Sequence, residues 1–315
     1  NEFDAGLAIR HAIYTPFAQA VPSTYIIDMN MCLNKDGVIV CDKCMKACDR
    51  QAISFEMKPE TVELDVGTIT VATGADVFDP SSLPDYGYGR YPNVITSLEF
   101  ERLINAGGPS GGHLIRPSDM QIPNRVAFVQ CVGSRSDRNG RLYCSNVCCM
   151  NTIKDSLLIK EHWPETEIYV FYVDIRAYGK GFEDLYKRAR REGVVFIRGL
   201  PAEIIEDRKT HDMWLIGENT LQKELYKISA DMVILSLGLE PRKDSEIIQR
   251  LLTLSRTQDG FFMEAHPKLR PVDAATGGIF FAGCAEAPKD IKDSVTQASA
   301  AAARAGILMA KGKVT

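Results

Sequence analysis

Residues 125–150, RVAFVQCVGSRSDRNGRLYCSNVCCM, decide the fold, because they join an apolar strand to a helix through a cysteine-rich stretch. The apolar run 125–130 is typical of a buried strand in a parallel sheet. Four cysteines follow it with the spacing C-x12-C-x3-C-C: Cys131, Cys144, Cys148 and Cys149. We expect Cys131 at the C-terminal end of the strand, Cys144 and Cys148 on one helix face, and Cys149 about 100° further round. The pattern predicts that strand and helix bring four sulfurs together.

Four thiolates in a compact group favour a [4Fe–4S] cluster, because each iron of the cube takes one soft anionic ligand. The alternative is a set of buried core thiols or a disulfide. Vicinal cysteines rarely bond each other, and four thiols within so short a stretch exceed what packing needs. We therefore predict cluster ligands.

A further cysteine group lies nearer the N-terminus and has the spacing C-x8-C-x2-C-x3-C. Its members are Cys32, Cys41, Cys44 and Cys48. The spacing resembles the bacterial ferredoxin run, although Asp49 stands where that run has proline. Structural zinc is the alternative, since four-cysteine zinc sites also contain C-x2-C. We predict a [4Fe–4S] module over residues 25–56.

Apolar strands and helices alternate after residue 150, where the helix that carries the cysteines is expected to continue to about His162. Further strands are predicted at residues 62–71, 167–174, 194–197, 232–237 and 278–282. Further helices are predicted at residues 97–106, 182–192 and 294–311. The order predicts an α/β fold with a doubly wound parallel sheet.

Two strand ends followed by glycine are candidates for binding a phosphate group, because the N–H groups and dipole of a helix N-terminus attract anions. One is the Thr73-Gly74 turn, and the other is Gly283 with the helix that follows it. An ordinary strand end is the alternative at each. No G-x-G-x-x-G follows a predicted strand, so neither an FAD nor an NAD fingerprint is complete. After strand 125–130, a cysteine group stands where a nicotinamide-binding loop would be expected.

The composition is that of an ordinary globular protein of one or two domains, with 45% hydrophobic and 25% charged residues among 315. The net charge of −4 provides no basic field, so we expect no nucleic-acid partner. We also expect no membrane span, because no apolar run is long enough. Nine cysteines without a signal peptide indicate a reducing cytoplasm. The chain begins with Asn1 rather than Met, which suggests a fragment.

These motifs resemble the flavin-binding core of the heterodisulfide reductase A subunits over essentially the whole chain. The resemblance is carried by NEFDAGLAIRHAIYTPFAQAVP (1–22), VATG (71–74), CVGSR (131–135), YCSNVCCM (143–150), DIRAYGKGFEDLY (174–186) and GCAEAPKDIKDSVTQASAAAARA (283–305). It implies a thioredoxin-reductase-like two-lobed flavoprotein that binds FAD without NAD and contains an inserted ferredoxin-like [4Fe–4S] module. Two [4Fe–4S] clusters are implied, one for each cysteine group.

The resemblance also implies a division into domains. Residues 1–24, 57–122 and 236–315 would form the FAD-binding lobe, and residues 25–56 the inserted module. Residues 123–235 would form a lobe that is like an NAD domain and carries a [4Fe–4S] cluster in place of NAD.

Members of this family are the flavin subunits of soluble complexes that split an electron pair between a low-potential and a high-potential acceptor. The resemblance implies a cytoplasmic oxidoreductase subunit of an anaerobe. It would transfer electrons between a donor, ferredoxin and a disulfide or other high-potential acceptor by flavin-based bifurcation. The implied partners are ferredoxin, iron–sulfur subunits, and hydrogenase or formate dehydrogenase modules. The alternatives are a non-bifurcating iron–sulfur relay, an NAD(P)H-dependent flavoprotein disulfide reductase, and the flavin subunit of a quinone-interacting oxidoreductase.

We expect the flavin ring between the helix after Cys149 and the segment that begins at Gly283. Lys154 is the candidate catalytic residue near flavin N5, and a solvated helix lysine is its alternative. The predicted cofactor contacts are Thr73, Gly74, Lys154, Gly283, Cys284, Ala285, Lys289, Asp290 and Gln297. Asp290 would otherwise only cap the helix. Arg176 and Lys180 are expected on a surface that faces a partner or a cluster.

Overall fold

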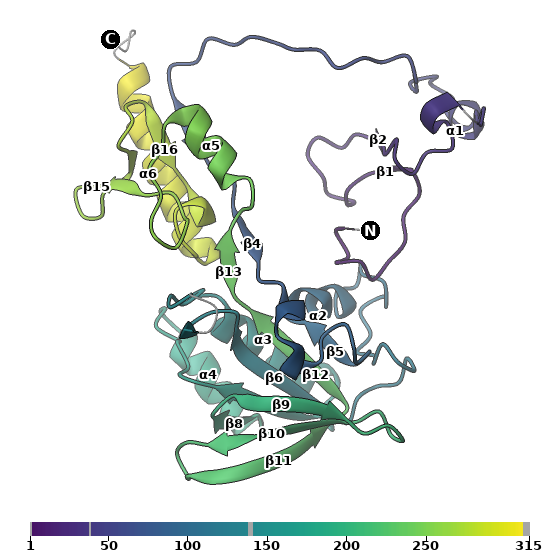
Figure 1. The fold of residues 1–315 in the computed structure, drawn as a ribbon, viewed down its shortest axis with the longest axis vertical. Helices are drawn as coiled ribbons and strands as arrows, with labels where there is room; N and C mark the ends of the chain where they lie inside the picture. Colours follow the sequence, from purple (N-terminus) through teal and green to yellow (C-terminus); the bar gives the residue numbers. More distant parts are fainter. Residues whose placement is uncertain (1, 38, 138–140, 311–315) are drawn as a thin grey trace. The chain divides into compact units, whose positions relative to one another are not determined.

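The computed structural model describes residues 2–37, 39–137 and 141–310, and the chain divides into two compact units (Figure 1). The larger unit comprises residues 66–100 and 114–315, and the smaller one residues 1–65 and 101–113. We describe each unit by itself. The predicted domain boundaries stay a prediction.

The larger unit is built on a five-stranded parallel sheet (Figure 1). Its strands, in spatial order, are β5 (Val94–Thr96), β12 (Met232–Leu237), β6 (Arg125–Val132), β7 (Glu167–Tyr172) and β8 (Val195–Arg198). Helix α3 (Cys148–His162) joins β6 to β7, and α4 (Phe182–Arg191) joins β7 to β8. The predicted βαβαβ order and the α/β class are confirmed.

The chain changes direction across this sheet between β6 and β12. Strands β6, β7 and β8 step one way, whereas β12 lies on the other side of β6. The carboxyl ends of β6 and β12 therefore form a topological switch point, the place where α/β sheets bind ligands. Leu237 pairs with Val132 there, beyond an irregularity in register after Leu235. Such irregularities often lie next to functional sites.

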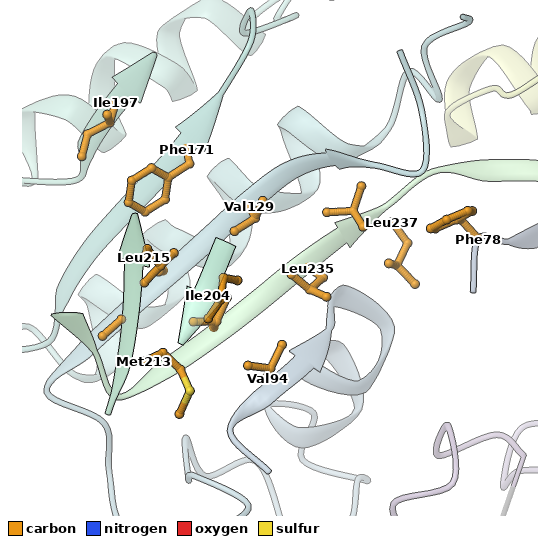
Figure 2. Close-up of a cluster of buried hydrophobic side chains, with 14 residues drawn as sticks. Phe78, Val94, Val129, Phe171, Ile197, Ile204, Met213, Leu215, Leu235 and Leu237 are labelled. Atoms are coloured by element: carbon orange, nitrogen blue, oxygen red, sulfur yellow. The ribbon is translucent and has the colours of Figure 1, made fainter. Parts of the chain in front are cut away.

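A three-stranded antiparallel sheet packs on one face of the parallel sheet. Its strands are β9 (Pro201–Glu206), β10 (Met213–Asn219) and β11 (Glu224–Ala230). Figure 2 shows the shared core, in which Val129, Phe171 and Leu235 meet Ile204, Met213 and Leu215. Each fully buried side chain of this kind contributes about 1.5–3 kcal/mol to folding. This sheet was not predicted, because polar residues interrupt the apolar pattern of its strands.

The opposite face of the parallel sheet is covered by helices. Phe128, whose side chain alternates with that of Val129, packs edge-on against Phe100 of α2 (Ser97–Leu103), with ring centroids 5.8 Å apart. Gln130 of β6 lies on the same face and donates to Thr152 of α3. Helix α3 therefore sits directly over the strand that precedes it.

A second, smaller sheet in this unit contains β14 (Glu264–His266), β15 (Arg270–Ala274), β16 (Ile279–Phe281) and β3 (Ile69–Val71). Helix α6 (Ile291–Met309) packs on it through Ala301 and Ala305, and α5 (Ser245–Leu252) precedes it in the chain. Strands β4 (Ala75–Val77) and β13 (Leu239–Pro241) form a two-stranded connection. Short 3-10 helices span Pro80–Ser82, Pro84–Tyr86 and Gly283–Ala285.

Two boundaries in this region differ from the prediction. The strand expected at residues 62–71 begins only at Ile69, because Val62, Leu64 and Val66 are exposed and belong to no strand. The helix expected from Ser294 begins at Ile291, where the Asp290 side chain caps it. The predicted helix end at Lys311 lies outside the described residues.

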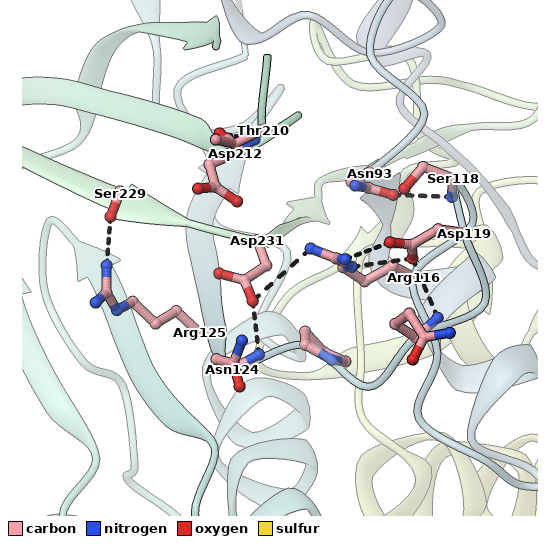
Figure 3. Close-up of polar contacts among 12 residues, drawn as sticks. Asn93, Arg116, Ser118, Asp119, Asn124, Arg125, Thr210, Asp212, Ser229 and Asp231 are labelled. Carbon is pink, nitrogen blue, oxygen red and sulfur yellow. Dashed lines mark hydrogen bonds and ion pairs between the residues drawn. The ribbon is translucent and has the colours of Figure 1, made fainter. Parts of the chain in front are cut away.

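The loop that leads into β6 is fastened at the amino-terminal edge of the parallel sheet (Figure 3). Asp231 accepts the Asn124 N–H at 2.7 Å and lies 3.9 Å from the Arg116 guanidinium. Asn93 accepts the Ser118 N–H at 3.0 Å. These polar contacts lie at the strand end opposite to the switch point, so they position the sheet rather than the site.

The smaller unit contains little regular structure. It includes β1 (Ile13–Tyr14), β2 (Ile26–Ile27), a 3-10 turn at Lys35–Gly37 and α1 (Lys43–Ala47). Strands β1 and β2 pair antiparallel. Arg102 forms an ion pair with Asp4 at 2.9 Å and stacks on the ring of Phe3.

Within residues 2–37, 39–137 and 141–310, we find no helix with the length and apolarity that a bilayer crossing requires.

Candidate metal and cofactor sites

The four cysteines of residues 131–149 gather at the carboxyl edge of the parallel sheet. Cys131 is the next-to-last residue of β6, and Cys148 and Cys149 open α3. The Cys148 thiol donates to the carbonyl of Leu237, the last residue of β12, at 3.3 Å. The Cys149 thiol donates to the carbonyl of Asp174, just beyond β7, at 3.7 Å. Strand ends and one helix start thus converge at the switch point.

Burial, together with the neighbouring thiols, raises the pKa values of Cys131, Cys148 and Cys149. Burial raises the pKa of Cys131 to about 11, with smaller contributions from Cys149 and Cys144. Burial also raises the pKa of Cys148, and the thiols of Cys131, Cys149 and Cys144 add to the effect. Burial likewise raises the pKa of Cys149, although the backbone N–H of Arg176 opposes it. Such thiols are weak nucleophiles by themselves, but a bound metal deprotonates a coordinating thiol.

The prediction that Cys144 and Cys148 share one helix face is wrong. Helix α3 begins at Cys148, so Cys144 lies in the loop before it, where its sulfur accepts the Asn146 N–H at 3.3 Å. Asn146 has a left-handed backbone (φ 61°), which breaks the helix periodicity between the two cysteines. Cys144 nevertheless interacts electrostatically with Cys148 and Cys149, so the four thiols remain one group.

The backbone around Cys131 is specialised. Cys131 and Arg135 both have left-handed conformations, with φ of 58° and 54°, which non-glycine residues adopt mainly at functional sites. Gly133 between them has φ 84°, and a Cβ there would lie 2.1 Å from the Phe78 ring. The glycine of the CVGSR stretch is therefore required by close packing as well as by the turn.

Sequence reasoning missed a charged pair and a buried polar group beside the cysteines. Arg135 forms an ion pair with Asp174 at 2.7 Å. Gln130 donates to Thr152 at 2.6 Å and to Ser236 at 3.1 Å, and all three side chains are buried. Arg135 and Asp174 stand in the quoted CVGSR and DIRAY stretches, which was the available signal.

The cysteine group nearer the N-terminus, formed by Cys32, Cys41, Cys44 and Cys48, lies in the smaller unit on loops around α1. Cys44 is in α1, and Cys48 ends it. The Asn34 side chain binds both the N–H and the carbonyl of Cys41, at 2.7 and 2.6 Å, which holds that loop against the turn after Cys32. Cys44 and Cys48 line a cavity of about 930 Å³ whose other walls are mainly apolar, including Ile13 and Ile27.

All nine cysteines lie in the described part of the chain, and each is a free thiol there. The disulfide alternative for residues 131–149 is therefore not seen. Across the described residues, no three histidine, cysteine, aspartate or glutamate side chains lie close enough together to ligate a single metal ion, so the case for the cysteines rests on a [4Fe–4S] cube, in which each cysteine binds a different iron.

Several predicted cofactor contacts meet in one cavity of the larger unit. Gly74, Gly283 and Cys284 line a space of about 470 Å³, together with Ser294 and Val295 of α6. Gly74 and Gly283 both have left-handed backbones, with φ of 77° and 69°, so glycine suits each turn. Among the described residues, the buried Oγ1 of Thr73 and Oε1 of Gln297 have no hydrogen-bond partner. The arrangement supplies an open glycine-lined cavity, and the two unpartnered polar atoms belong to residues that are adjacent in sequence to its walls, Gly74 and Ala298.

A neighbouring cavity of about 550 Å³ lies between α3 and α6. Its walls include Val147, Met150 and Asn151 from the start of α3, and Lys289 and Asp290 from the start of α6. These are the two segments between which we expected the flavin ring. The helix periodicity places Lys154 one turn beyond Met150 and Asn151 on the same face.

The remaining predicted contacts have partners within the protein. The exposed Lys154 ammonium lies 2.8 Å from the buried carboxylate of Asp155. Lys289 forms an ion pair with Glu286, and Asp290 accepts the Asp293 N–H at 2.7 Å as the helix cap. The Cys284 thiol donates to the Lys289 carbonyl at 3.5 Å.

Two further predicted residues are placed as follows. Ala285 is buried in the core with Phe262 and Phe281. Gln297 donates to Glu286 at 3.2 Å.

Two residues near the group of Cys131, Cys144, Cys148 and Cys149 were expected on the surface. Arg176 and Lys180 are exposed in the stretch between β7 and α4. The roles of all these residues toward a cofactor stay predictions.

The fold and the site define an α/β protein with a partly buried four-cysteine group at the switch point of its parallel sheet. No protein-family model matches the chain. Curated proteins match it over its whole length. The iron–sulfur A subunit of CoB–CoM heterodisulfide reductase from Methanocaldococcus jannaschii is 52% identical over 99% of this chain and 47% of that protein. The A subunit of the H2:CoB–CoM heterodisulfide,ferredoxin reductase of Methanothermobacter thermautotrophicus is 50% identical over 100% and 47%.

A third relative is the A subunit of the ferredoxin/F420H2-dependent CoB–CoM heterodisulfide reductase of Methanosarcina acetivorans, 43% identical over 100% of this chain and 39% of that protein. The chain is therefore similar over its whole length to heterodisulfide reductase A subunits, and it spans about half the length, or less, of the curated relatives it matches.

Among solved structures, thioredoxin reductases from T. acidophilum and Lactococcus lactis are similar to the chain, at 12% and 18% identity and TM-scores of 0.46 and 0.48. The matched regions span 79% and 78% of this chain, respectively, and 66% of each thioredoxin reductase chain. The α/β class rests on the sheet described above.

Proposed function

We propose that the chain is the flavin- and iron–sulfur-binding part of a heterodisulfide-reductase-type oxidoreductase and transfers electrons within such a complex. The observation that carries this proposal is the convergence of Cys131, Cys144, Cys148 and Cys149 at one strand edge. Similarity to the curated relatives supports it, because those proteins are named as iron–sulfur or ferredoxin-linked reductase subunits. An iron–sulfur centre supplies one-electron transfer, and a flavin converts between one- and two-electron steps.

The cysteine residues fit a [4Fe–4S] cluster in three respects. Cys131 and Cys149 are buried, and burial together with the neighbouring thiols raises the pKa values of Cys131, Cys148 and Cys149, so that a bound metal would be needed to hold them as thiolates. Cys148 and Cys149 occupy the first turn of a 15-residue helix, where the helix dipole stabilises thiolates. The loop that carries Cys144 is held by Asn146, whose side chain donates to the Pro288 carbonyl at 3.1 Å. For Cys32, Cys41, Cys44 and Cys48 the proposal of a second cluster rests on their ferredoxin-like spacing.

FAD fits the two cavities on the α6 side of the larger unit. The open turns at Gly74 and Gly283 leave room for a cofactor to approach the backbone. The unsatisfied Thr73 hydroxyl and Gln297 amide oxygen are buried polar atoms that a bound group would satisfy. In this arrangement Lys289 and Asn151 would border the ring, and Lys154 would act from the next helix turn.

The finer proposal concerns the use of the electrons. Two centres that each carry one electron, placed with a two-electron flavin, suit flavin-based bifurcation between a donor, ferredoxin and a disulfide or other high-potential acceptor. Names of relatives link them to ferredoxin, H2 and the CoB–CoM heterodisulfide. We propose corresponding partners here: iron–sulfur subunits, ferredoxin, and hydrogenase or formate dehydrogenase modules, in the cytoplasm.

The test is a compositional assay of the chain purified without oxygen. We expect about eight iron atoms, matching sulfide and one FAD per chain, since two cubes of four irons are proposed. Iron without flavin would contradict the flavin proposal and favour a simple relay. Colourless protein would overturn the whole proposal.

Matched variants make the flavin arm specific. Thr73→Val removes the hydroxyl that lacks a partner, whereas Thr73→Ser keeps it. Losing one hydrogen bond of about 0.5–1.5 kcal/mol should weaken FAD binding about two- to tenfold in Thr73→Val only. Flavin fluorescence during titration measures this. Equal affinities in the two variants would remove Thr73 from the site.

A further inference from the structure

Arg135 is a largely buried cation beside the four-cysteine group, and the proposed function does not yet use it. Its side chain is 16% exposed. Arg135 lies in the turn that follows Cys131, where the Ser134 N–H donates to the Cys131 carbonyl at 3.1 Å, and its charge acts on the thiols of Cys131, Cys144 and Cys149. One cation therefore interacts with three of the four sulfurs.

The local fold positions this cation. The left-handed backbone of Arg135 turns the chain after β6, and its N–H donates to the Tyr143 carbonyl at 3.1 Å. The Tyr143 hydroxyl in turn donates to the Leu239 carbonyl at 2.9 Å. The turn that carries Arg135 is thus tied to the loop that carries Cys144.

Asp174 contacts both Arg135 and Cys149. Its carboxylate accepts from Arg135 at 2.7 Å, and its backbone carbonyl accepts from the Cys149 thiol at 3.7 Å. Arg198 also reaches this carboxylate, at 3.6 Å, but its side chain is 40% exposed. Asp174 therefore fixes Arg135 and partly neutralises it.

We infer that Arg135 sets the reduction potential of the centre held by Cys131, Cys144, Cys148 and Cys149, and that Asp174 moderates its effect. The inference rests on the proposed function, because it requires an iron–sulfur centre at these sulfurs. On reduction the centre gains one electron and its net charge falls by one, while no bond at Arg135 forms or breaks. A fixed positive charge near the sulfurs stabilises the reduced form more than the oxidised form. Arg135 thus raises the potential and Asp174 lowers it.

The test is an anaerobic redox titration of the whole chain, followed by electron paramagnetic resonance. The relevant signal is the one that disappears in Cys148→Ala. Arg135→Gln should make its midpoint potential more negative by about 59 mV, a tenfold change in the ratio of reduced to oxidised centre for one electron. Asp174→Asn should shift it in the positive direction. Opposite shifts from two substitutions that each neutralise one charge are what a merely structural role would not produce.

Two variants serve as controls. Arg135→Lys keeps the charge and should remain closer to the native potential than Arg135→Gln. Arg198→Gln removes a charge from the exposed side of Asp174 and should leave the potential nearly unchanged. An unchanged potential in Arg135→Gln with native iron and sulfide content overturns the inference. If Arg135→Gln binds no iron, the Asp174→Asn variant provides the test. An unchanged midpoint potential in Asp174→Asn would then overturn the inference. A native chain without this signal overturns the proposed function itself.

Discussion

Asp273 illustrates how single residues support the fold that carries the cofactor cavity. It lies on β15 at 3% exposure and accepts from Arg304 of α6 at 2.8 Å and from Arg270 at 3.2 Å. Burial opposes its ionisation, but the hydrogen bonds from Arg304 and Arg270 outweigh this and hold its pKa below 3.8. The ion pair between Asp273 and Arg304 fastens α6 to the four-stranded sheet.

We predict that Arg304→Gln destabilises the protein at pH 7 by about 1 kcal/mol, since half of the Arg304 side chain is solvent-screened and Arg270 remains. A lowered pKa in the folded state means that the stabilisation is present above pH 3.8 and is lost as the pH falls through the folded-state pKa. The difference between variant and native should therefore shrink below pH 3.8.

Denaturant unfolding followed by far-ultraviolet circular dichroism measures this difference at pH 7 and at pH 3. Iron-free protein should be used, because acid removes iron from clusters. A difference that is the same at both pH values would contradict the role given to the Asp273 carboxylate.

At the residue scale, the sequence predicts the ligands better than their surroundings. Cysteine spacing alone identified both candidate groups, because few other functions need four thiols so close together. Arg135 and Asp174 could not be recognised in the same way, since they are 39 residues apart and meet only because β6 and β7 are neighbours. The same holds for Thr73 and Gln297, whose buried atoms become apparent only in the fold.

Three elements that carry the second cysteine group are held together by a buried polar cluster. Gln130 of β6 donates to Thr152 of α3 and to Ser236 of β12, and the two hydroxyls lie 3.0 Å apart. Gln130 precedes Cys131 in the chain, and Thr152 lies one helix turn after Cys148 and Cys149. This cluster fixes the spacing of the elements immediately behind the sulfurs.

We predict that Thr152→Val, which keeps the shape but removes the hydroxyl, lowers the free energy of unfolding by about 1–3 kcal/mol, because it leaves buried partners unsatisfied. It should also lower iron retention during anaerobic gel filtration. Thr152→Ser is the matched control, since it keeps the hydroxyl and should retain iron like the native chain. Native iron retention in Thr152→Val would show that this cluster does not position the cysteines.

At the element scale, the parallel strands and the helices between them were predictable from apolar runs and their alternation. The antiparallel sheet β9–β11 was not, because only one face of each strand is buried and the other carries a mixture of apolar and charged residues, such as Trp214, Ile216 and Glu218 of β10. The start of α3 was also misjudged. A left-handed Asn146 cannot be read from a sequence in which helix spacing of Cys144 and Cys148 looked favourable.

At the scale of the whole molecule, the two cysteine groups belong to different compact units. We therefore predict that each binds iron without the other. Cys44→Ala and Cys148→Ala should each reduce the iron content from about eight to about four atoms per chain. Iron and sulfide analysis of the whole chain checks this. Loss of all iron from Cys44→Ala would contradict the independence of the two groups.

The layering of the larger unit has a consequence for access to its cysteine group. The antiparallel sheet β9–β11 covers one face of the parallel sheet, and α3 covers the other. The sulfurs lie at the carboxyl ends of the strands, and the cavity between α3 and α6 borders the same helix start. A redox partner that exchanged electrons with these sulfurs would have to approach along the direction of the strands, because an approach through either face of the sheet is blocked by a layer of packed side chains.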